Sequence, residues 1–164
     1  MMQQQSKASQ RQTIEQERGK EAWSSIKGIK ALGKKEQQEY RSLARGLNAM
    51  IQVNGLGQSL GFFYAKSRDE KTGQPNSKKA HYQILNQLTT WMRGHFTQGT
   101  NTIGEEYDGL LSWVLDKNTF SSDYRRATTE CLAFGRWLGR FAEAELADNT
   151  TISVGSTAEG IGNG

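Results

Sequence analysis

The sequence predicts an all-α fold, a compact helical bundle of about six helices. Pro75 is the only proline in the 164 residues. Long stretches are rich in Leu, Ala, Glu, Gln, Lys and Arg, which favour helix. No run alternates Val, Ile or Thr with polar residues, as a half-buried strand would. The length suits one domain, which buries roughly two thirds of the surface of its unfolded chain.

A single all-α domain is expected over residues 13–147, between two tails. Residues 1–12 are rich in Gln and Ser, and residues 148–164 are small, polar and rich in Gly, so both tails are expected to be disordered. No apolar run reaches the ~20 residues of a membrane span, and the N-terminal segment lacks the apolar part of a secretory signal. We therefore expect a cytoplasmic protein with no membrane partner.

The first two helices are expected over residues 13–32 and 34–53. Thr13 is a suitable N-cap for the first helix, and Gly33 ends it. The second helix has the clearest amphipathic pattern in the chain. The residues expected to face inward are Ile14, Ala22, Ile26, Ile29 and Leu32 from the first helix and Tyr40, Leu43, Ala44, Leu47, Met50 and Ile51 from the second.

The next two helices are expected over residues 56–66 and 77–96, with a loop between them that contains Gly, Pro, Asn and Ser. Both helices repeat apolar residues at helical spacing. The residues expected to be buried are Leu56, Leu60, Phe63 and Tyr64 from the earlier helix and Ile84, Leu85, Leu88, Trp91 and Met92 from the later one.

A second loop, residues 97–104, precedes a short helix over 107–115 and a long helix over 123–147. Ser122 can cap the long helix. Its apolar stripe suits packing within the domain or against a partner helix, and packing within the domain is favoured at this length. The stripe consists of Tyr124, Ala127, Cys131, Phe134, Leu138 and Phe141. Gly135 and Gly139 are expected to let another helix approach closely.

The stretch GLGQSLG, residues 55–61, resembles two nucleotide-binding motifs and fits neither. A dinucleotide fingerprint needs its third glycine one position earlier and a preceding strand. A P-loop needs Lys and then Ser or Thr after the last glycine, whereas Phe62 follows Gly61. The better account is a helix that ends at Asn54 and Gly55 before a new helix starts.

The side chains that could carry catalysis have simpler structural explanations. Cys131, the single cysteine, lies on the apolar stripe of the last helix, where a thiol is usually inert. The acids of residues 105–108 suit the first turn of a helix. His95 suits a polar helix cap, and His81 a solvated position. We expect no catalytic residue, no metal site and no cofactor.

Charge is unevenly distributed along the chain. Residues 1–104 carry 16 Lys or Arg against 7 Asp or Glu, and residues 105–164 carry 5 against 10. This split can attract a polyanion to one half and, if the halves lie at opposite ends, favour head-to-tail packing of copies. Two differently solvated groups of helices would give the same split.

Three helices each carry a basic flank. In the second helix Lys34, Gln38, Arg41, Arg45, Asn48 and Gln52 fall within roughly 100° of arc. The first helix offers Lys20, Trp23, Lys27 and Lys30, and the last offers Arg125, Arg136 and Arg140.

These flanks predict a grip on a nucleic-acid backbone that is indifferent to base sequence. A base can stack on Trp23 while neighbouring lysines neutralise phosphates. The alternative is that the basic residues are ordinary solvent-facing side chains and that Trp23 packs against another helix or subunit.

Two longer segments carry a resemblance to a known family. They are YRSLARGLNAMIQVNGLGQSLGFFYAKS and WVLDKNTFSSDYRRATTECLAFGRWLGRFAEAEL. In this order they resemble the small subunit of the type III-B CRISPR effector, the Cmr or RAMP-module complex, and the resemblance covers most of residues 13–147. Asn48 and Gly61 depart from the family, which often has proline and alanine there, so each is expected to loosen or re-angle its helix.

The resemblance implies a small, non-catalytic protein that takes part in antiviral defence. Several copies would stack beside the backbone subunits and line the channel where guide RNA pairs with target RNA. The implied partners are both RNA backbones, the backbone and large subunits, and other copies of the chain. A stand-alone helical nucleic-acid-binding or transcription-associated protein stays open as the alternative.

Overall fold

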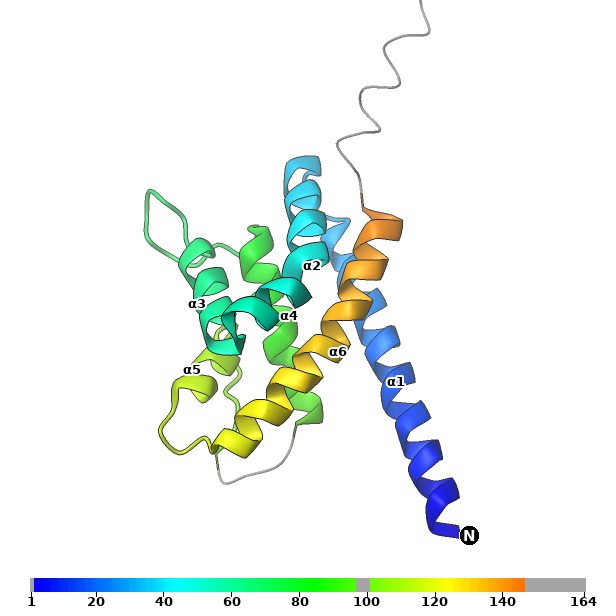
Figure 1. Ribbon diagram of the computed structural model, residues 1–164. Coiled ribbons are helices and arrows are strands. Elements are labelled where there is room, and N and C mark those ends of the chain that lie inside the picture. The colour runs from blue at the N-terminus through cyan, green and yellow to red at the C-terminus, as the bar shows by residue number, and fades with distance from the viewer. Residues whose placement is uncertain (1, 97–100, 147–164) are drawn as a thin grey trace, which may run out of the picture.

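The computed structural model describes residues 2–96 and 101–146, and the side chains from Thr13 onward. Within these residues the chain forms six helices and no strand beyond an isolated bridge between Arg68 and Pro75. The predicted all-α bundle is therefore confirmed (Figure 1). The helices are α1 (Met2–Ile29), α2 (Lys34–Asn54), α3 (Leu56–Lys66), α4 (Ala80–His95), α5 (Gly109–Leu115) and α6 (Ser121–Glu145).

The predicted and observed helices differ mainly at their ends. Helix α1 begins at Met2, so Thr13 lies inside the helix and does not cap it. The N-cap of α6 is Phe120, so the predicted cap at Ser122 is also wrong. The division into a domain from residue 13 and an N-terminal tail stays a prediction. The predicted C-terminal tail, residues 148–164, lies outside the described residues.

Local turns explain two of the shifted helix starts. Before α4, the carbonyl oxygen of Asn76 accepts the backbone N–H of Lys79 at 3.0 Å, which holds a turn where we predicted the first helical residues. Before α5, the chain turns at Glu106, whose carbonyl oxygen accepts the N–H of Gly109. The acids of residues 105–108 thus precede α5 and do not form its first turn.

Helix α6 occupies the middle of one face of the bundle and packs along both α1 and α2 (Figure 1). Helix α4 contacts α2, α3, α5 and α6 and completes the core. Within that core the rings of Trp91 and Phe134 stack with their centroids 4.9 Å apart. The buried Tyr40 hydroxyl donates to Oε1 of Gln87 at 2.5 Å, and burial raises its pKa.

The predicted core is mostly buried. Ile14 is the exception, because it is 41% exposed. Several residues at the core margin are partly buried and pack against it: Leu32, Leu43, Met50, Tyr64, Tyr124 and Phe141. The other residues predicted to face inward are all buried.

The glycine-rich stretch forms a joint between α2 and α3, as predicted. Gly55 has a φ of 83°, and its N–H donates to the carbonyl oxygen of Ile51 at 2.8 Å, which closes the last turn of α2. The Tyr124 hydroxyl accepts the N–H of Gly57 at 2.9 Å and so ties the start of α3 to α6. Helices α2 and α3 run unbroken through Asn48 and Gly61.

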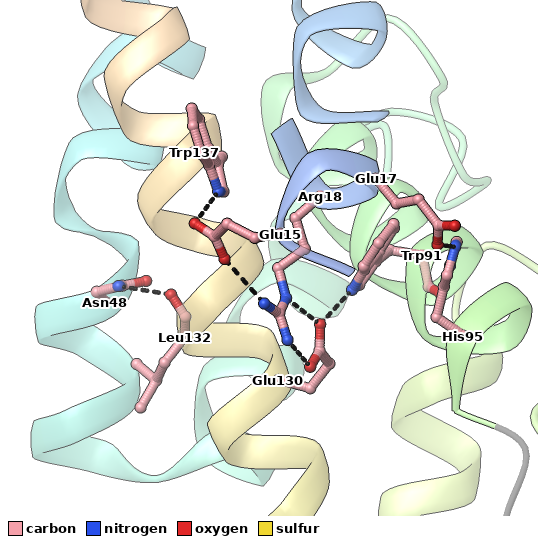
Figure 2. Close-up of polar contacts among 9 residues, drawn as sticks. All are labelled: Glu15, Glu17, Arg18, Asn48, Trp91, His95, Glu130, Leu132 and Trp137. Atoms are coloured by element: carbon pink, nitrogen blue, oxygen red, sulfur yellow. Dashed lines mark hydrogen bonds and ion pairs between the residues drawn. The ribbon is translucent and has the colours of Figure 1, made fainter. Parts of the chain in front are cut away.

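A carboxylate on α6 ties α1 and α4 to the bundle (Figure 2). Arg18 donates from Nε and Nη2 to the two carboxylate oxygens of Glu130, each at 2.8 Å, and the Trp91 indole donates to Oε1 at 2.9 Å. Burial raises the pKa of Glu130, but these hydrogen bonds outweigh it and leave the pKa below its usual value. Beside it, Glu15 accepts from Arg18 and from the Trp137 indole.

Both histidines make specific contacts. His95 stacks on Trp91 with centroids 3.7 Å apart, and its Nε2 lies 3.2 Å from the Glu17 carboxylate. His81 is buried, so the prediction that it is solvated was wrong. It lies 3.5 Å from Glu39, and burial lowers its pKa more than that carboxylate raises it.

Candidate nucleic-acid interface

Helices α2 and α6 cross in close contact at two glycines. A Cβ atom on Gly139 would lie 3.1 Å from the backbone oxygen of Ala44, and one on Gly135 would lie 2.3 Å from Oδ1 of Asn48. The predicted close approach is therefore confirmed. Asn48 also donates to the carbonyl oxygen of Leu132 at 2.9 Å, which fixes the crossing (Figure 2).

This crossing leaves a hollow between the two helices, which we call the α2–α6 groove. Its volume is about 330 Å³. The groove brings together Arg45 from one predicted basic flank and Arg136 and Arg140 from another. The full lining is Ala44, Arg45, Asn48, Gly135, Arg136, Gly139, Arg140 and Glu143.

Positively charged side chains outnumber negatively charged ones in the groove. Arg45 Nε lies 3.1 Å from Oε1 of Glu143, with both side chains about half exposed. Within the residues that the structure describes, Arg136 and Arg140 form no hydrogen bond or ion pair through their side chains. Three guanidinium groups therefore face one carboxylate, which leaves a net positive site open to an anion.

Arg136 and Arg140 also border a second hollow, on the side of α6 that faces α1. This hollow has a volume of about 180 Å³, and its other lining residues are Glu15, Ala133 and Trp137. The two arginines thus stand on a ridge between two shallow depressions. A polyanion that crosses α6 would meet both of them.

The basic flank of α1 is partly neutralised by α6. Lys30 pairs with Oε2 of Glu145 at 2.5 Å, and the Trp23 indole donates to Oε1 of the same carboxylate at 2.7 Å. These two hydrogen bonds hold the pKa of Glu145 below its usual value. Lys20 is exposed and lies closer to the N-terminal end of α1 than Trp23 and Lys30 do.

The ring of Trp23 already has neighbours on which it packs. Phe141 stacks on it with centroids 5.8 Å apart, and Nζ of Lys27 lies 4.3 Å from the ring centroid. The side chain is still 45% exposed. These contacts favour the packing interpretation, and a stacking role for Trp23 in binding a base stays a prediction.

The remaining predicted residues lie away from the α2–α6 groove. Lys34 is the first residue of α2, and Arg41, one turn before Arg45, is partly buried. Arg125 lies near the start of α6, about 16 Å along the helix axis from Arg136. The structure thus brings together three of the predicted residues and spreads the others along the same helices.

Sequence reasoning missed two carboxylates that form ion pairs with the basic flanks, Glu143 and Glu145. Glu143 follows Arg136 and Arg140 on the same face of α6, since residues four and seven positions apart share a face. That spacing was visible in the sequence. The pairing of Glu143 with Arg45 was not, because it depends on how α2 crosses α6.

The described residues contain no group of three or more His, Cys, Asp or Glu side chains arranged to hold a metal ion. Cys131 is fully buried, and burial raises the pKa of its thiol, which disfavours the reactive thiolate. None of the described helices is both long and apolar enough to cross a membrane.

Comparison with known protein families places most of the chain in one family. The family model described as CRISPR-associated protein (Cas_Cmr5) matches residues 14–145. The chain belongs to the Cmr5 family. Membership of the Cmr5 family supports a role as a subunit of a type III-B CRISPR complex.

A solved structure of a Cmr5 family member has a similar fold. It is the crystal structure of a CRISPR-associated Cmr5 family protein from Thermus thermophilus, with 25% sequence identity and a TM-score of 0.59. The match covers 81% of this chain and 97% of the other. The similarity therefore extends over nearly the whole Cmr5 domain and is not confined to a shared pair of helices.

Proposed function

We propose that the chain is the non-catalytic small subunit of a type III-B CRISPR effector complex in the cytoplasm. In this role it helps to line the channel where guide RNA pairs with target RNA, and it supports the neighbouring backbone and large subunits and other copies of itself. The observation that carries the RNA-binding part is the meeting of Arg45, Arg136 and Arg140 in one groove of a Cmr5 family member.

The chemistry of the groove suits a sugar–phosphate backbone. Guanidinium groups bind phosphate oxygens through pairs of N–H donors. Arg136 and Arg140 are one helical turn apart, and neither has an acidic partner among the described residues. Such contacts position an RNA strand without reading its bases, as a subunit that accepts any guide and target requires.

Charge reversal on the ridge tests the RNA-binding part. We expect Arg136→Glu with Arg140→Glu to weaken binding of target RNA by the reconstituted complex about tenfold or more, because two phosphate contacts are lost and two repulsive charges are added. Binding is measured by fluorescence anisotropy with labelled target RNA over a range of salt concentrations. The variant should also show a shallower salt dependence.

Lys71→Glu with Lys78→Glu provides the matched control. It changes the net charge equally, on the exposed loop between α3 and α4, which projects away from α6 (Figure 1). We expect this control to leave RNA affinity nearly unchanged. Equal losses of affinity in both variants would mean that net charge alone explains the effect. No loss in either variant would mean that RNA does not contact Arg136 and Arg140.

A further inference from the structure

The pair formed by Arg45 and Glu143 spans the α2–α6 groove from one wall to the other. Arg45 comes from α2 and Glu143 from α6, and their side chains are 52% and 50% exposed. An ion pair that is this exposed is weak, because water and salt screen it. Arg45 can therefore exchange one oxyanion partner for another at little cost.

The same groove holds Arg136 and Arg140 on the α6 wall. A phosphate group held by these arginines would lie within the same hollow as the Arg45 guanidinium. It would then offer Arg45 a second set of anionic oxygens, next to those of Glu143. The carboxylate and the phosphate cannot both accept the same pair of N–H donors from one guanidinium group.

We propose that Glu143 is an internal competitor of the RNA phosphate for Arg45, and that it limits the affinity of the groove for RNA. This inference rests on the proposed function, because it assigns the groove to an RNA phosphate. In the free chain Arg45 pairs with Glu143. When a phosphate enters, Arg45 turns to it, and Glu143 is left to solvent. The competition keeps the grip weak enough for the strand to be released.

A neighbouring observation supports the phosphate as occupant over an apolar group. Gly135 and Gly139 lie where α2 and α6 are in close contact, and five of the eight lining residues carry polar or charged side chains. Glu145, another carboxylate near the basic flanks, is held by Lys30 and Trp23 on the α1 side of α6. Glu143 is thus the carboxylate that faces Arg45.

A double-mutant cycle tests the competition in the reconstituted complex. The four forms are the wild type, Glu143→Gln, Arg45→Met, and the combination of both. We expect Glu143→Gln to raise the affinity for labelled target RNA about two- to fivefold, the range that an exposed ion pair can supply. In the Arg45→Met background the same substitution should change affinity far less, because the residue through which Glu143 acts is missing.

Each other outcome overturns the inference in a distinct way. An equal gain with and without Arg45 would mean that Glu143 acts only as a general negative charge. No gain at all would mean that it does not compete. If Glu143→Gln changes how much of the chain enters the complex and leaves RNA affinity unchanged, the groove receives an acidic protein side chain instead.

The charge-reversal variant separates this inference from the proposed function. If Arg136→Glu with Arg140→Glu abolishes RNA binding while the cycle shows no coupling, only the competition is wrong. If neither the reversal nor the cycle affects RNA binding, the groove is not an RNA site, and both statements fail.

Discussion

From the sequence alone, Trp23 fits a role in helix packing and a role in binding a base equally well. Its position among three lysines is typical of a stacking platform for a base. In the folded chain the ring stacks on Phe141, and its indole N–H is bonded to Glu145. A residue in contact with two side chains of α6 contributes to the docking of α1.

We therefore expect Trp23→Ala to destabilise the protein. The free energy of unfolding should fall by about 1–3 kcal/mol, less than for a fully buried tryptophan because the ring is 45% exposed. Thermal melting of the purified chain measures the effect, and Trp23→Phe should retain most of the stability. Unchanged melting together with weaker RNA binding would instead assign the ring to a base.

Glu130 on α6 accepts hydrogen bonds from both Arg18 on α1 and Trp91 on α4. We expect Glu130→Gln to lower the free energy of unfolding at pH 7 by about 1.5–3 kcal/mol, because Arg18 loses its charged partner. The pKa of Glu130 is lowered by folding, so its contribution is complete above its unfolded pKa. That contribution is lost as the pH falls through the folded pKa.

The stability difference between wild type and Glu130→Gln should therefore shrink in acid. Urea unfolding at pH 7 and near pH 3 measures it. Glu105→Gln, at an exposed position, serves as the control and should differ little from wild type at either pH. A difference that stays constant between the two pH values would mean that the ionised carboxylate is not what stabilises the contact.

At the scale of whole helices, two elements were predicted almost to the residue, α2 and α3. Their boundary depends on Gly55, which has a positive φ. Glycine adopts such a φ readily, so this boundary can be predicted from the residue type alone. The starts of α1, α4, α5 and α6 were misplaced. The turn before α4 depends on hydrogen bonds that Asn76 accepts from Lys78 and Lys79. A Ser or Thr near a helix start does not always become the cap.

Gly46 and Gly139 differ in how closely the neighbouring helix approaches them, so alanine at each position tests the crossing of α2 and α6. Alanine is favoured over glycine inside a helix by about 1 kcal/mol. Gly46→Ala on α2 should gain part of this, because a Cβ there meets nothing within 4 Å. Gly139→Ala should lose stability, because its Cβ would lie 3.1 Å from the backbone oxygen of Ala44.

Thermal melting of both glycine variants tests how tightly the helices cross. We expect the melting temperature to rise for Gly46→Ala and to fall for Gly139→Ala. If both variants melt at a higher temperature than wild type, α2 and α6 are not in close contact at Gly139, and the groove has another shape.

At the level of the whole molecule, the described parts of the chain do not separate its basic first part from its more acidic second part in space. The basic first part includes α1 and α2, and the more acidic second part includes α6. Because α6 packs against both α1 and α2, the two parts interleave (Figure 1). Within the described residues the two parts therefore do not lie at opposite ends, and self-association stays a prediction.

The candidate site could be predicted in part. Helical spacing identified Arg45, Arg136 and Arg140, because residues on one face of a helix follow from the period alone. It could not tell which flanks would meet. The opposing carboxylates Glu143 and Glu145 gain their roles from contacts between helices, and such contacts depend on packing that periodicity does not contain.

The central claim is that the chain works as a subunit of a type III-B CRISPR complex. Purification of the tagged chain from its host, followed by RNA sequencing and mass spectrometry of what accompanies it, tests this most directly. We predict that guide RNA and the backbone and large subunits copurify with it. A preparation that contains neither guide RNA nor those subunits would contradict the account and favour a stand-alone nucleic-acid-binding protein.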